Sequence, residues 1–289
     1  MSPLLTVPLV ALPAGGIVFA GVHRWPHRDP LAPRVSPATI VGQGQRHPRL
    51  RALLRSRFDA TDETGLLLTA AVGLIVASAS AFGIVAAMVR SNRGLAVYDL
   101  FFAQWGARNA TPFSTEGLKL VSWCGGYPAL VALSCVVAAN EYRRKLGRSV
   151  IPMLTMVVGG QFALTNLIKF TVDRARPDLL QLTGFTGTSF PSGHAAAAAA
   201  SYAVFALILG RRQSSNVKAI LGGCAVAIAV AVASTRVLLG VHWFTDVIAG
   251  LLIGWAWFMM ISIVFGGRVI RFGRPLAQAR AVIEQQADA

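Results

Sequence analysis

The chain has 289 residues, of which 54% are hydrophobic and only 13% are charged. Soluble globular proteins carry about a quarter charged residues, so this composition excludes an ordinary soluble domain and indicates a membrane protein. The formal net charge of +15 would also suit a nucleic-acid binder, but the Lys and Arg residues lie between apolar runs and in both tails. That placement favours basic loops beside a lipid bilayer, with no nucleic acid as partner.

Residues 1–62 are expected to form a basic, flexible, cytoplasmic segment. Its first part, residues 4–22, is apolar but contains Pro8 and Pro13, and no basic residues precede it, so a signal peptide is not expected. The sequence leaves three alternatives for this part: an extra short span, a membrane-surface segment or disordered chain. Residues 24–57 are rich in Pro, Arg and Gly, a composition typical of a flexible tail.

Six uncharged runs follow, and each can supply the roughly 17–25 apolar residues that a membrane-spanning helix requires. The runs are 64–89, 120–140, 149–168, 192–210, 219–235 and 247–267. Their Ala-rich and Gly-rich faces suit close packing of helices in lipid. The predicted fold is therefore all-α: an integral membrane bundle of six transmembrane helices over residues 63–268, with a cytoplasmic tail over 269–289.

The basic residues predict the orientation of this bundle. Lys and Arg are concentrated in the N-terminal segment, in the connections after the second and fourth spans, and after the last span. The other three connections hold fewer of them. By the positive-inside rule, both termini are cytoplasmic, and the first, third and fifth connections lie outside the cytoplasm.

Neither the cysteines nor the carboxylates predict a metal centre. Cys124, Cys135 and Cys224 lie inside apolar runs without the spacing of metal ligands, which indicates small core residues. Only 12 residues are Asp or Glu, and few of them lie near a candidate site, so a cage of carboxylates is hard to assemble. We expect no metal and no cofactor.

The third connection carries two clusters of polar residues. In the first, Lys169 ends a span and Arg176 follows in the loop; such cations bind anions, but basic residues at a helix end also commonly reach for the membrane interface. In the second, Ser192, Gly193 and His194 begin the next span. A helix N-terminus with Ser as N-cap and Gly for close approach is a ready phosphate site, and the alternative is an ordinary capped helix.

The fifth connection carries a third cluster, Arg236, His242 and Asp246. On a helix, residues four apart share one face, so Asp246 can hold one imidazole nitrogen of His242 and leave the other free to attack. An isolated His–Asp pair is often only a satisfied polar pair. A charge at membrane depth, however, costs about 2.5–3.5 kcal/mol even on the lenient insertion scale, so the charges of Arg236 and Asp246 indicate a functional role.

Together the three clusters supply cations, a helix N-terminus and two histidines, one of them backed by a carboxylate. Cations and N–H groups can bind phosphoryl oxygens and stabilise charge that develops in a transition state. One histidine can attack phosphorus while the other protonates the departing oxygen. This chemistry requires no metal.

In these residues the chain resembles the type 2 phosphatidic acid phosphatase superfamily of membrane lipid phosphatases. Its motifs, Lys-x6-Arg-Pro, Pro-Ser-Gly-His and Ser-Arg-x5-His-x3-Asp, occur here in order within residues 169–246. One departure is Thr235, which stands before Arg236 where the family has Ser and keeps the hydroxyl. The resemblance covers roughly residues 149–267 and the six-span layout.

The resemblance implies that His242 forms a phosphohistidine, that Asp246 orients it and that His194 is the general acid. It implies phosphate binding by a set of five residues: Lys169, Arg176, Ser192, Gly193 and Arg236. Asp173 and Arg174 match no motif position and are interpreted as solvated loop charges. A site outside the cytoplasm agrees with the bacterial members, so we expect a multi-pass protein of a bacterial inner membrane.

The preferred substrate is a polyprenyl (pyro)phosphate, with phosphatidylglycerophosphate and phosphatidate as alternatives, since each places a headgroup at the interface and its tail in lipid. A phosphotransferase would use the same phosphohistidine and pass the phosphate to another acceptor. A non-catalytic lipid-phosphate binder or transporter would not need the His–Asp pair. A vanadate-using peroxidase shares the motifs, but its relatives are typically soluble, and the six spans argue against it.

Overall fold

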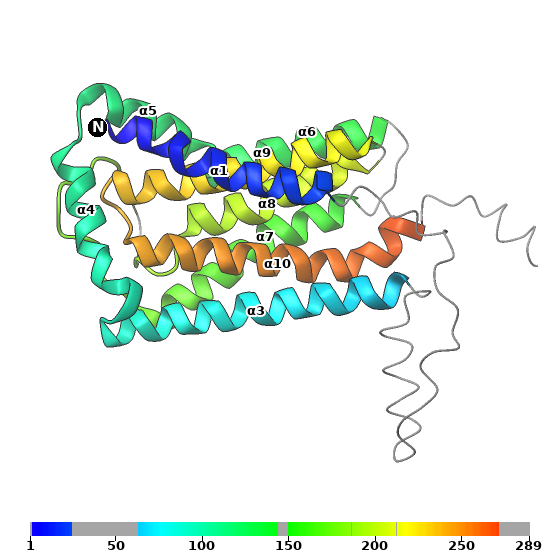
Figure 1. Ribbon diagram of the computed structural model, residues 1–289, viewed down its shortest axis with the longest axis horizontal. Helices are drawn as coiled ribbons and strands as arrows, with labels where there is room; N and C mark the ends of the chain where they lie inside the picture. Colours follow the sequence, from blue (N-terminus) through cyan, green and yellow to red (C-terminus); the bar gives the residue numbers. More distant parts are fainter. Residues whose placement is uncertain (1, 25–62, 144–149, 186, 212, 272–289) are drawn as a thin grey trace, which may run out of the picture.

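The structure is a computed structural model, and it describes residues 2–24, 63–143, 150–185, 187–211 and 213–271. These residues are 83% helical and contain no strand. The elements are α1 (Pro3–Arg24), α3 (Glu63–Ser91), η2 (Gly94–Tyr98), α4 (Asp99–Arg108), α5 (Pro112–Trp123), α6 (Tyr127–Arg143), α7 (Val150–Val172), α8 (Gly193–Gly210), α9 (Ser215–Leu238) and α10 (Phe244–Arg271). The long helices run side by side, while η2, α4 and α5 gather at one end (Figure 1), here called the α4–α5 end.

Six of these helices are long and apolar enough to cross a membrane: α1, α3, α7, α8, α9 and α10. The prediction of an all-α membrane bundle with six spans is thus confirmed. The membership of the six differs in two places, because α1 is one of them and the predicted span 120–140 is broken. In that region α5 and α6 meet at an angle of 46° and together form a seventh candidate.

Two glycines explain the break between α5 and α6. A Cβ atom on Gly125 would lie 2.3 Å from Val232 Cγ1 and 3.2 Å from the carbonyl oxygen of His194. The chain can therefore pass this close to α8 and α9 only without a side chain at that position. Gly126 also lies beside the His194 ring: a Cβ atom on Gly126 would lie 3.9 Å from Nε2 of His194. The uninterrupted hydropathy of residues 120–140 conceals this turn.

Helix α8 is the centre of the bundle and contacts α6, α7, α9 and α10. Its residues 195–200 are all alanine and all buried. Helix α10 approaches it through Gly250 and Gly254, whose Cβ atoms would lie 2.6 Å from the Ser192 oxygen and 2.4 Å from the Ala196 oxygen. Small residues thus hold the N-terminus of α8 against the first turns of α10.

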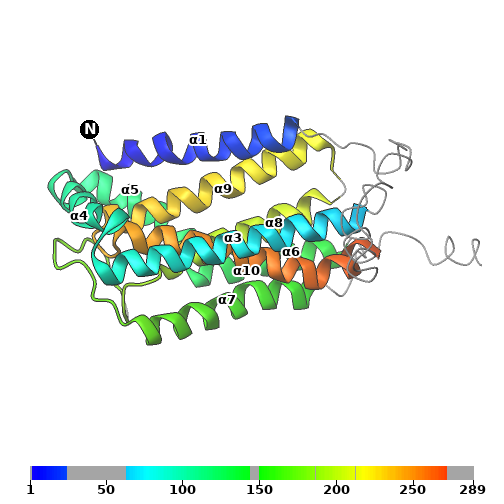
Figure 2. The same ribbon diagram turned by 60° about the horizontal axis from the view of Figure 1, so that its bottom comes forward.

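Helix α1 lies on the outside of α9 (Figure 2) and crosses it where Gly15 meets Gly223. Its start packs at the α4–α5 end, with Leu4 and Val7 against Leu118. The interior prolines are accommodated, as is common in membrane helices, where neighbouring groups satisfy the freed backbone. The apolar part of residues 1–62 is therefore a helix of spanning length, and the predicted basic tails over 25–62 and 272–289 lie outside the described residues.

The two ends of the described chain lie at opposite ends of the bundle (Figure 1). Helix α1 starts at the α4–α5 end, whereas α10 starts there and finishes at the other end. The prediction that both termini are cytoplasmic counted no span before residue 63, and it stays a prediction because residues 272–289 lie outside the described residues. The first, third and fifth predicted connections do lie together at the α4–α5 end.

Candidate active site

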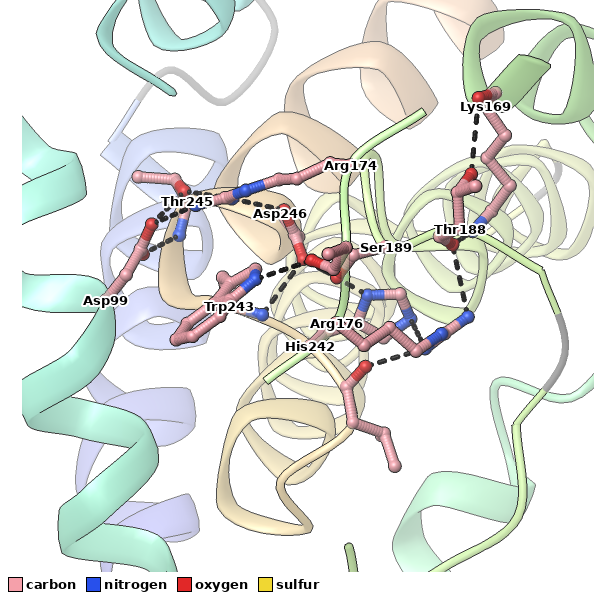
Figure 3. A network of polar contacts seen from close by, with 12 residues as sticks. Asp99, Lys169, Arg174, Arg176, Thr188, Ser189, His242, Trp243, Thr245 and Asp246 are labelled. Carbon is pink, nitrogen blue, oxygen red and sulfur yellow. Dashed lines mark hydrogen bonds and ion pairs between the residues drawn. The ribbon is translucent and has the colours of Figure 1, made fainter. Parts of the chain in front are cut away.

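The three predicted clusters meet at the α4–α5 end, and Figure 3 shows Arg176 of the first cluster with His242 and Asp246 of the third. The loop after α7 is tied to the turn between α9 and α10 by Arg176, whose Nη1 donates to the carbonyl oxygen of Val241 at 2.6 Å. The same nitrogen lies 3.3 Å from Nε2 of His242. The start of α8 joins them because the Ser192 N–H donates to the carbonyl oxygen of Asp246 at 2.9 Å. Residues far apart in sequence thus share one site.

His242 is buried and pairs with Asp246, with Nδ1 3.4 Å from Oδ2. The sequence placed both residues on one helix, but His242 precedes α10, which begins at Phe244. The pair forms because Asp246 Oδ2 accepts the N–H of Trp243 at 2.9 Å and folds the turn back on itself. Nδ1–H therefore donates a hydrogen bond to the carboxylate, and the lone pair of Nε2 faces Arg176.

Burial lowers the pKa of His242 to about 4, because the apolar surroundings disfavour the imidazolium more than Asp246 favours it. The ring is therefore neutral at physiological pH. This depressed pKa also makes the free energy of unfolding depend on pH. The contribution of neutral His242 is fully present above the ordinary pKa of 6.5 and is lost as the pH falls through about 4. A neutral imidazole with a free lone pair is the form that can act as a nucleophile.

Asp246 is fully enclosed, and both of its oxygens accept hydrogen bonds. Oδ2 accepts hydrogen bonds from the Ser189 hydroxyl, from the N–H of Trp243 and from Nδ1 of His242. Oδ1 accepts from Nη1 of Arg174 at 2.6 Å. A carboxylate held at both oxygens cannot rotate, so the orientation of the imidazole is fixed with it.

Three cations from three segments surround the histidines. Lys169 at the end of α7 and Arg176 in the following loop both donate to the carbonyl oxygen of Thr188. Burial lowers the pKa of Arg176 from its ordinary value, against the opposing effect of Asp246. Arg236, in the last turn of α9, is 5% exposed. The cluster is held largely by neutral oxygens, which leaves an excess of positive charge.

Among the buried side-chain polar atoms that lack a hydrogen-bond partner in the described part of the chain, two belong to this site: Nε of Arg236 and Oγ of Ser192. Nη1 of Arg236 donates to the Ser122 hydroxyl at 2.7 Å, so this side chain is half satisfied. Ser192 is the N-cap of α8, as predicted, yet its hydroxyl makes no capping bond. A buried donor without a partner is costly, and a bound phosphate would satisfy both groups.

His194 stands in the first turn of α8, partly buried beside the α5–α6 break. Its electrostatic neighbours are His242 and the three cations. The two histidines therefore border the same positively charged space. One of them is fixed by a carboxylate, whereas the other faces the cations directly, so the two rings have different chemical environments.

The interpretation of Arg174 as a solvated loop charge is wrong. Its side chain is 17% exposed and forms ion pairs with Asp246 and with Asp99, a buried residue that the sequence analysis did not single out. Asp173, in contrast, is exposed. The signal for Asp99 is its position, because a carboxylate in the apolar run Val97–Phe102 of a chain with few acids is expensive unless it is paired.

Comparisons with known proteins agree with this geometry. A family model described as the PAP2 superfamily matches residues 149–269. Phosphatidylglycerophosphatase B of Bacillus subtilis is 32% identical over 164 residues, which cover 56% of this chain and 79% of that protein. A lipid A 1-phosphatase of Rhizobium etli is 36% identical over 124 residues, 39% of this chain and 48% of that protein.

A solved structure is also similar, with a TM-score of 0.63 and 28% identity. The match covers 67% of this chain and 96% of that one, a transmembrane PAP2-type phosphatidylglycerolphosphate phosphatase from Bacillus subtilis. The matched family region contains all eight predicted site residues. Asp99 lies before that region, which is one reason why motif reasoning did not reach it.

Proposed function

The chain belongs to the PAP2 superfamily and is a lipid phosphatase, and on that premise we propose that it removes the terminal phosphate of a phospholipid headgroup through a phosphohistidine on His242. The observation that carries this proposal is the neutral, carboxylate-backed imidazole beside a buried guanidinium with an unused donor. That combination suits attack on a phosphoryl group whose oxygens the cations hold.

In the first step, Nε2 of His242 forms a bond to phosphorus while the bond from phosphorus to the lipid oxygen breaks. The proton stays on Nδ1, and Asp246 accepts its hydrogen bond and stabilises the positive charge that develops on the ring. Lys169, Arg176 and Arg236, with Ser192 and the N–H groups at Gly193, bind the phosphoryl oxygens. A protonated His194 donates its proton to the departing oxygen, and the doubly negative phosphate favours that protonated form.

In the second step, neutral His194 takes a proton from water, and the water oxygen attacks phosphorus. The bond from phosphorus to Nε2 breaks, which releases inorganic phosphate and restores the neutral ring of His242. All charge changes occur among groups that are already in place, so the protein need not reorganise during the reaction. This scheme uses no metal ion.

Phosphatidylglycerophosphate is the first substrate candidate, because that activity is in the name of the similar Bacillus subtilis protein and in the description of the similar solved structure. A polyprenyl (pyro)phosphate, the choice favoured by the sequence alone, is the second. Both place a phosphate at the membrane surface and a long apolar tail in the bilayer. The site has the matching position, at one end of a bundle whose outer face is apolar.

We place the site on the outer face of a bacterial inner membrane. Helix α1 ends and α3 begins at the end of the bundle opposite the site (Figure 1), and the sequence between these two helices is rich in Arg. The connections rich in Lys and Arg belong to the cytoplasmic side by the positive-inside rule. If α1 crosses the membrane, the N-terminus lies on the side of the site.

Purified protein is expected to release phosphate from phosphatidylglycerophosphate in mixed micelles at an undiminished rate in excess chelator, since no step needs a metal. The measurement compares phosphatidylglycerophosphate, phosphatidate, a polyprenyl pyrophosphate and lipid A, with and without EDTA. A preference of about tenfold or more in kcat/KM identifies the substrate class. Loss of activity in EDTA that added divalent metal restores would overturn the scheme.

A further inference from the structure

A chain of buried polar contacts lies behind Asp246, on the side away from His242 (Figure 3). Arg174 occupies its centre, with Nη1 2.6 Å from Asp246 Oδ1 and Nη2 2.7 Å from Asp99 Oδ2. Asp99 is the first residue of α4 and is 3% exposed. Asp99, from a segment outside the three motifs, is therefore three contacts away from the proposed nucleophile, through Arg174 and Asp246.

Thr245 fixes this chain at the first turn of α10. Its N–H donates to Asp99 Oδ1 at 2.8 Å, and its hydroxyl lies 2.7 Å from Asp99 Oδ2 and 2.9 Å from Nη1 of Arg174. The guanidinium also lies over the Trp243 ring, 5.4 Å from its centre. Both oxygens of Asp99 and both terminal nitrogens of Arg174 thus have defined partners.

Stability alone is a poor reason for such an arrangement. Three charges must leave water, and well-packed apolar residues often serve as well as a buried ion pair or better. The chain does, however, supply what the reaction requires of Asp246. It provides the only charged partner of Oδ1 among the described residues and leaves Oδ2 directed at the imidazole.

We infer that Asp99 and Arg174 are positioning residues of the reaction, which act through Asp246 to fix the orientation and the proton affinity of His242. This inference rests on the proposed function for its catalytic meaning. Arg174 forms an ion pair with Asp246 and offsets part of the negative charge of that carboxylate. Asp99 forms an ion pair with Arg174 and offsets part of the positive charge of the guanidinium.

The charges that act on the His242 ring come from each element around it. Asp246 lies on α10, Arg176 in the loop after α7 and Arg236 on α9, with His194 and Lys169 beyond them. Asp99 and Arg174 form a second layer of opposite signs behind Asp246. Removing one or the other must therefore change the proton affinity of the ring in opposite directions.

The test compares Asp99→Asn and Arg174→Gln with Asp173→Asn, which neutralises an exposed carboxylate next to Arg174. For both test variants kcat should fall by about 10-fold to 100-fold, with KM changed by less than about threefold, because the groups orient a catalytic partner and do not contact substrate. Asp173→Asn should keep the wild-type values. Asparagine also tolerates the positive φ of 45° at that position.

The pH dependence separates positioning from a merely structural role. The midpoint for protonation of His242 should move to lower pH in Asp99→Asn and to higher pH in Arg174→Gln, each by about half a unit or more. It is read from the acidic limb of kcat/KM and from NMR of protein labelled at its five histidines, with His242→Gln for assignment. Shifts in the same direction, or none, would overturn the inference.

Two further measurements keep the test decisive. The double variant Asp99→Asn/Arg174→Gln removes both charges and should return the midpoint close to the wild-type value, even if a single variant unfolds. The NMR titration needs no turnover, so it tests the inference when the wild type releases no phosphate, the result that would instead defeat the proposed function. An active wild type with unchanged kcat and midpoint in both single variants would defeat the inference alone.

Discussion

Replacing His242 with alanine is expected to lower phosphate release from phosphatidylglycerophosphate by about 10⁴-fold or more. The substitution removes the atom that forms the bond to phosphorus, and the remaining cations bind substrate without a nucleophile beside it. KM should change much less than kcat. Steady-state and single-turnover rates of the purified variant measure both effects.

The matched control for this variant is His23→Ala, which removes an exposed imidazole from α1 outside the site. It should retain wild-type activity. Thermal unfolding in detergent checks that the variant with alanine at 242 is folded. A folded protein without His242 that kept more than about a tenth of the wild-type rate would exclude this residue as nucleophile.

His194→Ala should behave differently from His242→Ala when the leaving group is varied. In the first step the proposed general acid is needed only when the departing oxygen is basic, so an aryl phosphate with an acidic phenol should recover much of the lost rate of that step, measured as phenol release in a single turnover. The nucleophile is needed for every substrate. Equal losses on both substrates for both variants would contradict the assignment of separate roles.

Arg236→Gln is expected to lower activity by about 100-fold to 1,000-fold, because a charged donor to the phosphoryl oxygens is lost in a water-poor site. The same change should raise the unfolding temperature by about 2–4 °C, since within the described part of the chain the buried guanidinium has one neutral side-chain partner, the Ser122 hydroxyl. A gain in stability with a loss of activity is typical of a group that a ligand, and not the fold, requires.

The binding of inorganic phosphate or vanadate tests whether Arg236 contacts the anion. Either anion should raise the unfolding temperature of the wild type and have less effect on Arg236→Gln, because anions stabilise the state whose excess positive charge they neutralise. Arg143→Gln, at the exposed end of α6 away from the site, is the control and should respond like the wild type. An equal response of all three proteins would place the anion elsewhere.

The helices were readable from sequence where hydropathy and periodicity decide them. Five predicted spans agree with α3, α7, α8, α9 and α10 to within a few residues at most ends. The break at Gly125–Gly126 was not readable, because it depends on a close approach to α8 and α9 that only tertiary structure shows. Helix α1 was left undecided because Pro8 and Pro13 argue against helix in water but not in lipid.

The site was readable to the extent that its parts are local. The pairing of His242 with Asp246 follows from their spacing, although a turn and not a helix creates it. The N-cap position of Ser192 was also predicted. Its unused hydroxyl was not, since which hydrogen bonds a cap makes depends on what the rest of the site supplies.

The contacts that escaped the sequence join distant segments. The sequence favours a solvated loop charge for Arg174, and Asp99 belongs to none of the three clusters. Neither has a partner nearby in sequence, and only the packing of α4 against α10 brings them together. A buried charge is identified by its partner, and sequence spacing cannot reveal a partner about seventy positions away.

Rapid acid-free denaturation of the enzyme during turnover of a lipid labelled in its terminal phosphate tests the central claim most directly. The account predicts label on the protein that is stable in base, released in acid, located on the peptide containing His242 and absent from His242→Ala. Label on another residue would contradict it, as would turnover of a labelled aryl phosphate with no labelled protein in a variant lacking His194, since an acidic phenol leaves without the general acid while breakdown of the intermediate should be slowed.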